Sequence, residues 1–304
     1  MNIGLVSVGN PFVLAPMAGI NCTAFRLLCK ENGAGLLYTQ MIDSDLMCCK
    51  SREEIGRYLN IFDEERPVTV QLVGSDVDRM VHAAQAVEEF ADIIDINMGC
   101  ILPEYMKRKC GASLLKDMGK MEEITIAVIG AVEKPVTAKI RIGWDSQTIN
   151  AVNVSQILER CGIQAICIHG RTAEQKYSGK VNWTMMKQVK GAVSVPVIAN
   201  GDVTSYRSGQ KMLEKTGCDA VMIGREAKHA PWVFDKDFVV SNETVQKQIM
   251  RFIELYERYE KRKSLKELRE HVFWMFRDFK TRKNPKELHK VCSVEEIKEF
   301  LGDE

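Results

Sequence analysis

Eight short runs of β-branched and other apolar residues recur along the first three-quarters of this 304-residue chain. They lie at residues 12–15, 35–41, 68–72, 92–98, 136–142, 165–169, 196–200 and 220–223. Segments with helical periodicity separate them, for example at 76–90 and 149–161. Strands that alternate with helices of this length indicate a parallel sheet. Eight such units in roughly 225 residues favour a closed (β/α)8 TIM barrel over an open doubly wound sheet.

The remaining quarter of the chain has a different pattern. After about residue 242 the strand runs stop, and residues 245–260 repeat apolar side chains at helical spacing. Ser264, Asn284 and Ser293 are each followed three residues later by Glu, which is typical of helix starts. We therefore predict an α/β protein with two domains, a barrel over residues 1–241 and a small all-helical domain over residues 242–304.

Composition limits the environment and the partners. The ten cysteines show no Cys-x-x-Cys spacing, so we expect no metal site and a reducing compartment. The sequence shows no signal-peptide pattern and no apolar run long enough to span a membrane, which predicts a cytoplasmic protein that is not bound to a membrane. The net charge is +1, yet residues 258–290 hold twelve Lys/Arg against five Asp/Glu. Such an excess is a plausible footprint for phosphates, and a solvated helix face is the simpler alternative.

The predicted strands end in small or polar residues, which a purely structural barrel does not need. After the fourth run stand Asn97, Gly99 and Cys100, where Gly99 allows a sharp turn and the thiol can donate or accept a proton. A buried structural cysteine is the alternative for Cys100. Because parallel strands carry their chemistry at their carboxyl ends, we predict an enzyme.

The last two strand ends predict a phosphate site. Gly201 and Gly224 would expose backbone N–H groups beside Arg225, as barrels commonly do after strands seven and eight. No P-loop is present and no Gly-x-Gly-x-x-Gly follows a strand, so a nucleotide held by either motif is disfavoured. We infer instead a phosphate-bearing cofactor that lies across the barrel mouth. Lys139 and His169 also fall at strand ends, where the alternatives are a snorkelling lysine and a core histidine.

Seven motifs then resemble those of the flavin-dependent tRNA-dihydrouridine synthases. They are LAPMAGI (14–20), VQLVGSD (70–76), DINMGC (95–100), AKIRIGWD (138–145), IHGRT (168–172), ANGDV (199–203) and MIGR (222–225), in family order. The resemblance implies an oxidoreductase that uses FMN, with NADPH as electron donor, to reduce the uridine C5–C6 bond in tRNA. It also implies that the helical domain helps to bind tRNA.

The resemblance further implies roles for individual residues. Cys100 corresponds to the catalytic thiol that protonates the base. Asn97 and Arg171 would contact the substrate. The residues implied to bind FMN are Pro16, Met17, Ala18, Gln71, Lys139, His169, Asn200, Gly201, Asp202, Gly224 and Arg225.

One departure from the family concerns the loop after Cys100, where Ile101-Leu102 displaces the usual proline to position 103. Two alternatives to the tRNA hypothesis therefore remain at this point. One is an FMN barrel dehydrogenase of a small pyrimidine, of the dihydroorotate type. The other is an RNA-binding relative without catalytic turnover. The basic tail favours RNA over a small molecule, since a small-molecule enzyme does not need it.

Overall fold

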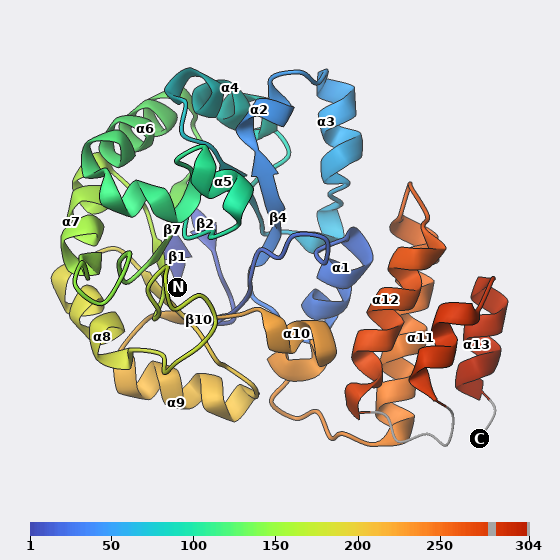
Figure 1. Ribbon diagram of the computed structural model, residues 1–304. Helices are drawn as coiled ribbons and strands as arrows, with labels where there is room; N and C mark the ends of the chain where they lie inside the picture. Colours follow the sequence, from blue (N-terminus) through green and yellow to red (C-terminus); the bar gives the residue numbers. More distant parts are fainter. Residues whose placement is uncertain (279–283, 303–304) are drawn as a thin grey trace.

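A computed structural model describes residues 1–278 and 284–302, and it confirms the predicted barrel (Figure 1). Eight parallel strands follow one another in space as β3-β10-β9-β8-β7-β6-β5-β4. They are β3 (Phe12–Leu14), β4 (Leu37–Asp43), β5 (Val68–Val73), β6 (Ile93–Met98), β7 (Val136–Arg141), β8 (Ile166–His169), β9 (Val197–Asn200) and β10 (Ala220–Ile223). A parallel bridge between Val13 and Leu36 joins the two end strands and closes the barrel.

Helices surround the barrel on its outer side (Figure 1). They are α1 (Thr23–Glu31), α2 (Ser44–Met47), α3 (Arg52–Leu59), α4 (Val77–Val87), α6 (Met118–Ala131), α7 (Ala151–Cys161), α8 (Trp183–Ala192), α9 (Tyr206–Thr216) and α10 (Arg225–His229). The short helix α5 (Pro103–Lys107) lies instead over the face of the barrel, in the loop after β6 (Figure 1). The outward residues of the strands pack against these helices in one large hydrophobic cluster. No helix within the described ranges is long and apolar enough to cross a membrane.

The inward-facing residues change character along the strands. Near the amino ends they form a second apolar cluster that includes Val13, Leu36 and Ile198. Toward the carboxyl ends the same face carries buried polar side chains, such as Gln71 and Asp95. Because side chains alternate between the two faces of a strand, one strand supplies both the outer core and the polar interior.

A short N-terminal hairpin was not predicted from the sequence. Strands β1 (Asn2–Ile3) and β2 (Val6–Ser7) pair antiparallel, and Ile3 and Val8 join the apolar cluster inside the barrel. The hairpin therefore covers the amino-terminal end of the barrel and leaves the carboxyl end open for a site.

The C-terminal region is helical, as predicted. It contains α11 (Asn242–Tyr259), α12 (Leu265–Met275) and α13 (Val294–Gly302), which lie together at one side of the barrel (Figure 1). The predicted helix starts are confirmed, since Ser264 accepts the N–H of Glu267 and Ser293 accepts that of Glu296. The segment after Asn284 is a 3-10 helix, Pro285–Lys290, rather than an α-helix.

Helix α11 packs along α1, and polar contacts join the helical region to the barrel. Arg251 of α11 forms an ion pair with Glu31 of α1. The carboxylate of Glu260 accepts the N–H of Ala24 at 2.9 Å. Three of the basic tail residues, Lys280, Arg282 and Lys283, lie outside the described residues.

A buried ion pair fastens the first helix of the barrel. The side chain of Arg26 is 3% exposed and that of Glu65 is 0% exposed. The Arg26 guanidinium also donates to the carbonyl oxygens of Asn21, Leu59 and Asn60 at 2.7–3.3 Å. One side chain thus ties α1 to the loop before it and to the end of α3 and the segment that follows α3.

We expect Glu65→Gln to lower the free energy of unfolding by about 3–5 kcal/mol, because it leaves a buried guanidinium without its counter-charge. Urea unfolding followed by circular dichroism measures the change. Glu53→Gln is the matched control, since Glu53 and Arg57 form an exposed pair 3.7 Å apart that should contribute little. Equal effects of the two substitutions would contradict the prediction.

Candidate functional site

A cavity of about 670 Å³ opens at the carboxyl ends of the barrel strands. Its volume lies in the range of about 300–1,000 Å³ that is typical of cofactor and ligand sites. The structure brings every predicted site residue except Arg171 into its lining. These residues are Pro16, Met17, Ala18, Gln71, Asn97, Cys100, Lys139, His169, Asn200, Gly201, Asp202, Gly224 and Arg225.

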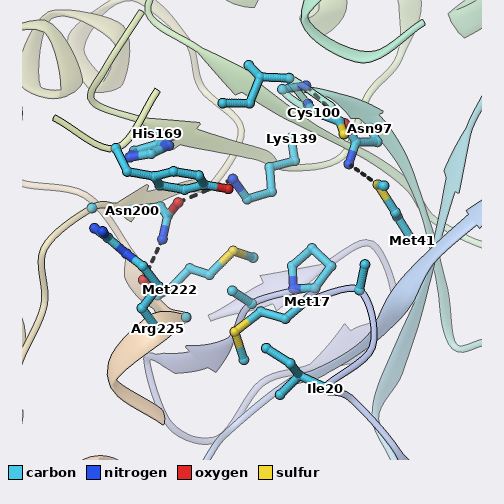
Figure 2. A pocket seen from close by; sticks show the side chains of 18 of the residues that line it. Met17, Ile20, Met41, Asn97, Cys100, Lys139, His169, Asn200, Met222 and Arg225 are labelled. Carbon is cyan, nitrogen blue, oxygen red and sulfur yellow. Dashed lines mark hydrogen bonds between the residues drawn. The ribbon is translucent and has the colours of Figure 1, made fainter. Parts of the chain in front are cut away.

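The parallel strands explain why residues so far apart in sequence meet. All eight strands point their carboxyl ends to the same rim, and alternation keeps every second side chain on the inner face. Figure 2 shows Lys139, His169 and Cys100 on one side of the cavity and Met17 and Ile20 on the other. The cavity therefore has a polar side and an opposite side with more apolar side chains.

Hydrogen bonds define the loop that carries Cys100. The Asn97 side-chain oxygen accepts the backbone N–H groups of Gly99 at 3.1 Å and of Cys100 at 2.8 Å. The Arg141 Nε donates to the Gly99 carbonyl at 2.8 Å. Burial raises the pKa of the half-buried Cys100 thiol, and the nearby carboxylate of Glu104 raises it further. The thiol is therefore protonated at neutral pH and suited to proton donation.

A second segment packs directly beneath this loop. Gly111 adopts a left-handed backbone with a φ of +59°, and a Cβ there would lie 2.6 Å from the Cys100 carbonyl oxygen. The N–H of Ala112 donates to the same oxygen at 2.9 Å. Pro103, displaced relative to the family, occupies the first turn of α5, a position where proline is favourable.

We expect Gly111→Ala to lower turnover by about 10-fold or more while leaving cofactor content unchanged. The added Cβ must push the Cys100 backbone aside, and displacement of a catalytic group by about 1 Å can cost up to roughly 10²-fold. Turnover per bound cofactor measures the effect. The control is Gly191→Ala on α8, where an added Cβ meets nothing within 4 Å. Wild-type turnover in Gly111→Ala would show that the position of Cys100 is not critical.

The partly exposed Lys139 and the buried Arg141 bring positive charge to the cavity. Among residues 1–278 and 284–302 neither forms an ion pair within 4 Å, although the buried carboxylate of Asp95 acts on Lys139 from below the lining. Lys139 Nζ donates to the Asn200 side chain at 3.2 Å, and Arg141 donates to backbone carbonyls. Burial lowers the pKa of Lys139 and lowers that of Arg141 to about 10. The site is therefore suited to an anionic group.

The histidine at the rim is neutral. His169 is 6% exposed, and burial lowers its pKa. The positive charges of Lys139 and Arg141 lower it further. His169 can therefore accept or donate a hydrogen bond at the cavity without adding a charge.

Arg171 is not in the cavity lining but lies directly behind it. Its side chain is 3% exposed, and its guanidinium forms a two-point ion pair with Asp202 and donates to the carbonyls of Ser178 and Gly179. Asp202 also accepts from Arg225 at 2.8 Å. Arg171 thus holds Asp202 in place, and its contact with a substrate stays a prediction.

Several lining residues were not predicted. They include Met41, Arg141, Tyr177 and Met222. Arg141 stands two residues after Lys139 on β7, so strand periodicity alone places the two on one face and could have identified it. Tyr177 comes from the loop after β8 and contacts the guanidiniums of Arg141 and Arg225, at 5.7 and 5.0 Å from its ring centroid. No sequence periodicity indicates that contact.

A second cavity of about 340 Å³ lies between the barrel and the helical region. Residues of the loop before α1, of α3 and of the turn between α11 and α12 line it. Its basic lining residues are Arg26, Lys50, Arg57, Lys261 and Arg262. Arg26 is neutralised by Glu65. The other four bring positive charge to this surface, and Glu54, Glu260 and Glu267 line it as well.

Comparison with solved structures places the fold among barrel enzymes. The chain is similar to an old yellow enzyme homologue from Zymomonas mobilis, with a TM-score of 0.60 and 12% sequence identity over 80% of this chain and 94% of that one. At this identity the likeness concerns the fold alone. Together, the (β/α)8 barrel and the cavity at its carboxyl mouth give the arrangement in which enzymes of this fold hold their active sites.

Sequence comparisons identify the family. The family model described as "Dihydrouridine synthase (Dus)" matches residues 13–302. The tRNA-dihydrouridine synthase B of Pseudomonas putida is 43% identical over 235 residues, which cover 77% of this chain and 69% of that protein. The proteins of the same name from Xanthomonas axonopodis and Vibrio vulnificus are 38% and 43% identical, over 83% and 78% of this chain and 77% and 73% of theirs. The chain belongs to the dihydrouridine synthase family, a family of oxidoreductases.

Proposed function

We propose that this protein reduces the C5–C6 double bond of uridine in tRNA to dihydrouridine, with FMN as cofactor and NADPH as electron donor. The observation that carries the proposal is the placement of Cys100. A protonated, half-buried thiol lies in the same cavity as the cations Lys139 and Arg141, in a member of the dihydrouridine synthase family. The NADPH assignment rests on the family resemblance.

The residues of the cavity fit FMN. A flavin carries a planar ring and an anionic phosphate, and the cavity offers both an apolar side and the cations Lys139 and Arg141. Pro16, Met17 and Ala18 would lie against the ring, and the backbone of Gly201 and Gly224 would approach the phosphate together with Arg225. The remaining residues proposed to hold FMN are Gln71, Lys139, His169, Asn200 and Asp202.

The chemistry explains why a thiol is needed. Reduced FMN, held by the residues named above, would supply a hydride for C6 of the uracil. Carbon C5 must then gain a proton from the opposite face, and the Cys100 Sγ–H donates it as a general acid. Asn97 shapes the loop that presents this thiol and lies next to the substrate. Because the uracil must enter a cavity in the barrel mouth, the nucleotide has to leave the RNA stack.

The helical region gives the RNA a second contact surface. We propose that residues 242–304 form a separate domain that binds tRNA, with Lys261 and Arg262 lining the cavity between it and the barrel. Lys50 and Arg57 face the same cavity from the barrel side. The basic side chains on both walls would contact phosphates of the RNA backbone beside the carboxylates of Glu54, Glu260 and Glu267, and binding should be strongly salt-dependent.

Purified protein tests the proposal directly. Its visible spectrum reports bound flavin, and incubation with NADPH and unmodified tRNA, followed by mass spectrometry of the nucleosides, reports dihydrouridine. Flavin absorbance with product supports the proposal. Flavin without product on tRNA, but with reduction of a free pyrimidine, would replace it by the small-molecule function. A protein that cannot be loaded with FMN would refute it.

A further inference from the structure

Asp95 is a buried acidic residue to which the proposed chemistry gives no role. It lies on the inner face of β6 with 0% exposure, below the cavity lining. In the strand register it stands between Gln71 of β5 and Thr137 of β7. Its two oxygens accept the Gln71 Nε2 at 2.7 Å and the Thr137 Oγ1 at 2.6 Å. A carboxylate is costly inside a barrel, so its presence there requires a reason.

A chain of hydrogen bonds leads from Asp95 to the catalytic loop. Gln71 donates to Asp95 and accepts the Asn97 Nδ2 at 2.8 Å. Asn97 in turn accepts the N–H groups of Gly99 and Cys100. Each member of the chain thus donates toward Asp95 and accepts from the side of Cys100.

The two ends of this chain determine its direction. A backbone N–H can only donate, and an ionised carboxylate can only accept. The side-chain amides between them could each turn by 180°, but only one orientation satisfies both ends. If Asp95 gains a proton, it can also donate, so its end of the chain no longer excludes the reversed orientation and only the backbone N–H groups oppose it. In the reversed orientation Asn97 would present its NH2 group to those donors, and the hydrogen bonds to Gly99 and Cys100 would be lost.

We propose that Asp95 is a positioning residue whose carboxylate sets the orientation of Gln71 and Asn97 and, through them, the backbone that presents Cys100. Only the role of Cys100 as the acid rests on the proposed function. The hydrogen-bond chain itself does not depend on it.

The surroundings of Asp95 make the orientation of this hydrogen-bond chain sensitive to pH. Burial raises the pKa of Asp95 to about 6, while the bonds from Thr137 and Gln71 and the charge of Lys139 oppose the increase. The other titratable groups that face it are Tyr38 and Cys167, whose own pKa values burial raises. Lys139 is therefore the charged neighbour, and Asp95 protonates as the pH falls through about 6.

Hydrogen exchange of the full chain, measured by mass spectrometry without RNA, tests the positioning. In the wild type we expect the protection factors of the Gly99 and Cys100 amides to fall by about 10-fold between pH 7 and pH 5, as the hydrogen bonds to Asn97 weaken. Asp95→Asn, which has no proton to gain, should show no such fall. Asp95→Leu should have low protection at both pH values. The amides of residues 93–96 in β6 are the internal control.

Thr137→Val provides a matched variant outside the cavity lining. It removes a hydrogen bond that lowers the pKa of Asp95, so the loss of protection should move to higher pH. The same pH dependence in the wild type and Asp95→Asn would overturn the proposal, even if Asp95→Leu does not fold. An equal loss of protection at all amides of β6 would also overturn the proposal, because it would indicate that the whole strand unfolds locally and not only the loop of Cys100.

Turnover separates this inference from the proposed function. If the wild type forms dihydrouridine, Asp95→Leu should lower kcat per bound FMN by about 10-fold or more without changing the KM for tRNA. Asp95→Asn should lack the decrease in kcat below about pH 6 that we expect in the wild type. If the wild type forms no dihydrouridine, the proposed function fails, whereas the exchange experiment still decides the role of Asp95. Unchanged kcat and an unchanged pH profile in both variants would refute the positioning role.

Discussion

Replacement of Cys100 by alanine is expected to lower dihydrouridine formation by at least about 10²-fold, the typical cost of losing a general acid. The substitution removes the only proton donor that we assign to C5 of the uracil. It should leave FMN bound and reducible by NADPH, because Lys139, Arg141 and the glycines at the ends of β9 and β10 are untouched. Flavin bleaching in a stopped-flow instrument and nucleoside mass spectrometry measure the two half-reactions separately.

Cys110→Ala is the matched control for this experiment. Cys110 lies on the same loop but is buried, with its Sγ 3.5 Å from the Ser75 Oγ, so its loss should affect turnover little. Wild-type turnover in Cys100→Ala, or a severe loss in Cys110→Ala, would assign the acid to another group. Since burial raises the pKa of Cys100, wild-type turnover should decline with rising pH only above the ordinary thiol value of about 8.5.

Charge reversal at Lys261, Arg262 and Lys263 should cause the largest change in RNA affinity. Lys261 and Arg262 line the cavity between the helical region and the barrel, where an RNA backbone would meet positive charge from both sides. If each of the three contacts one phosphate, the slope of log affinity against log salt should decrease by about two to three. Titrations of labelled tRNA at several salt concentrations measure both the affinity and the slope.

A second triple variant controls for net charge. Lys187, Lys211 and Lys215 are exposed on α8 and α9, away from the helical region (Figure 1). Their replacement by glutamate changes the net charge of the protein by the same amount, and most of the affinity for tRNA should be retained. Equal losses in both triple variants would indicate that overall charge governs binding. Unchanged RNA affinity after charge reversal at Lys261, Arg262 and Lys263 would show that these residues do not contact the RNA.

The strands could be predicted because their signal is local. All eight observed strands begin and end within two residues of the predicted runs. The capped helix starts at Ser264 and Ser293 were predictable for the same reason, since a cap and its partner are three residues apart. The N-terminal hairpin lacked such a signal, because its strands are two residues long.

The candidate site was predictable only in part. Strand ends must meet at one rim of a barrel, so the sequence placed Gln71, Lys139 and His169 together. It could not show how each side chain is held there. Arg171 follows β8 as the motif indicates, yet its guanidinium is occupied by Asp202, which is 31 residues away along the chain. The Arg26–Glu65 pair, which spans 39 residues, was likewise not predicted.

The sequence by itself determined the barrel, the helical tail, the cavity rim and the thiol at the end of β6. These features follow from apolar periodicity, capping patterns and motifs, all of which act over a few neighbouring residues. The tertiary structure alone decided that Lys139 and Arg141 meet at the cavity, that Gly111 lies beneath Cys100, and that a hydrogen-bond chain joins Asp95 to the loop of Cys100. The physical reason is that hydrogen-bond direction, burial and pKa depend on groups from strands distant in sequence, and these groups become neighbours only when the barrel closes.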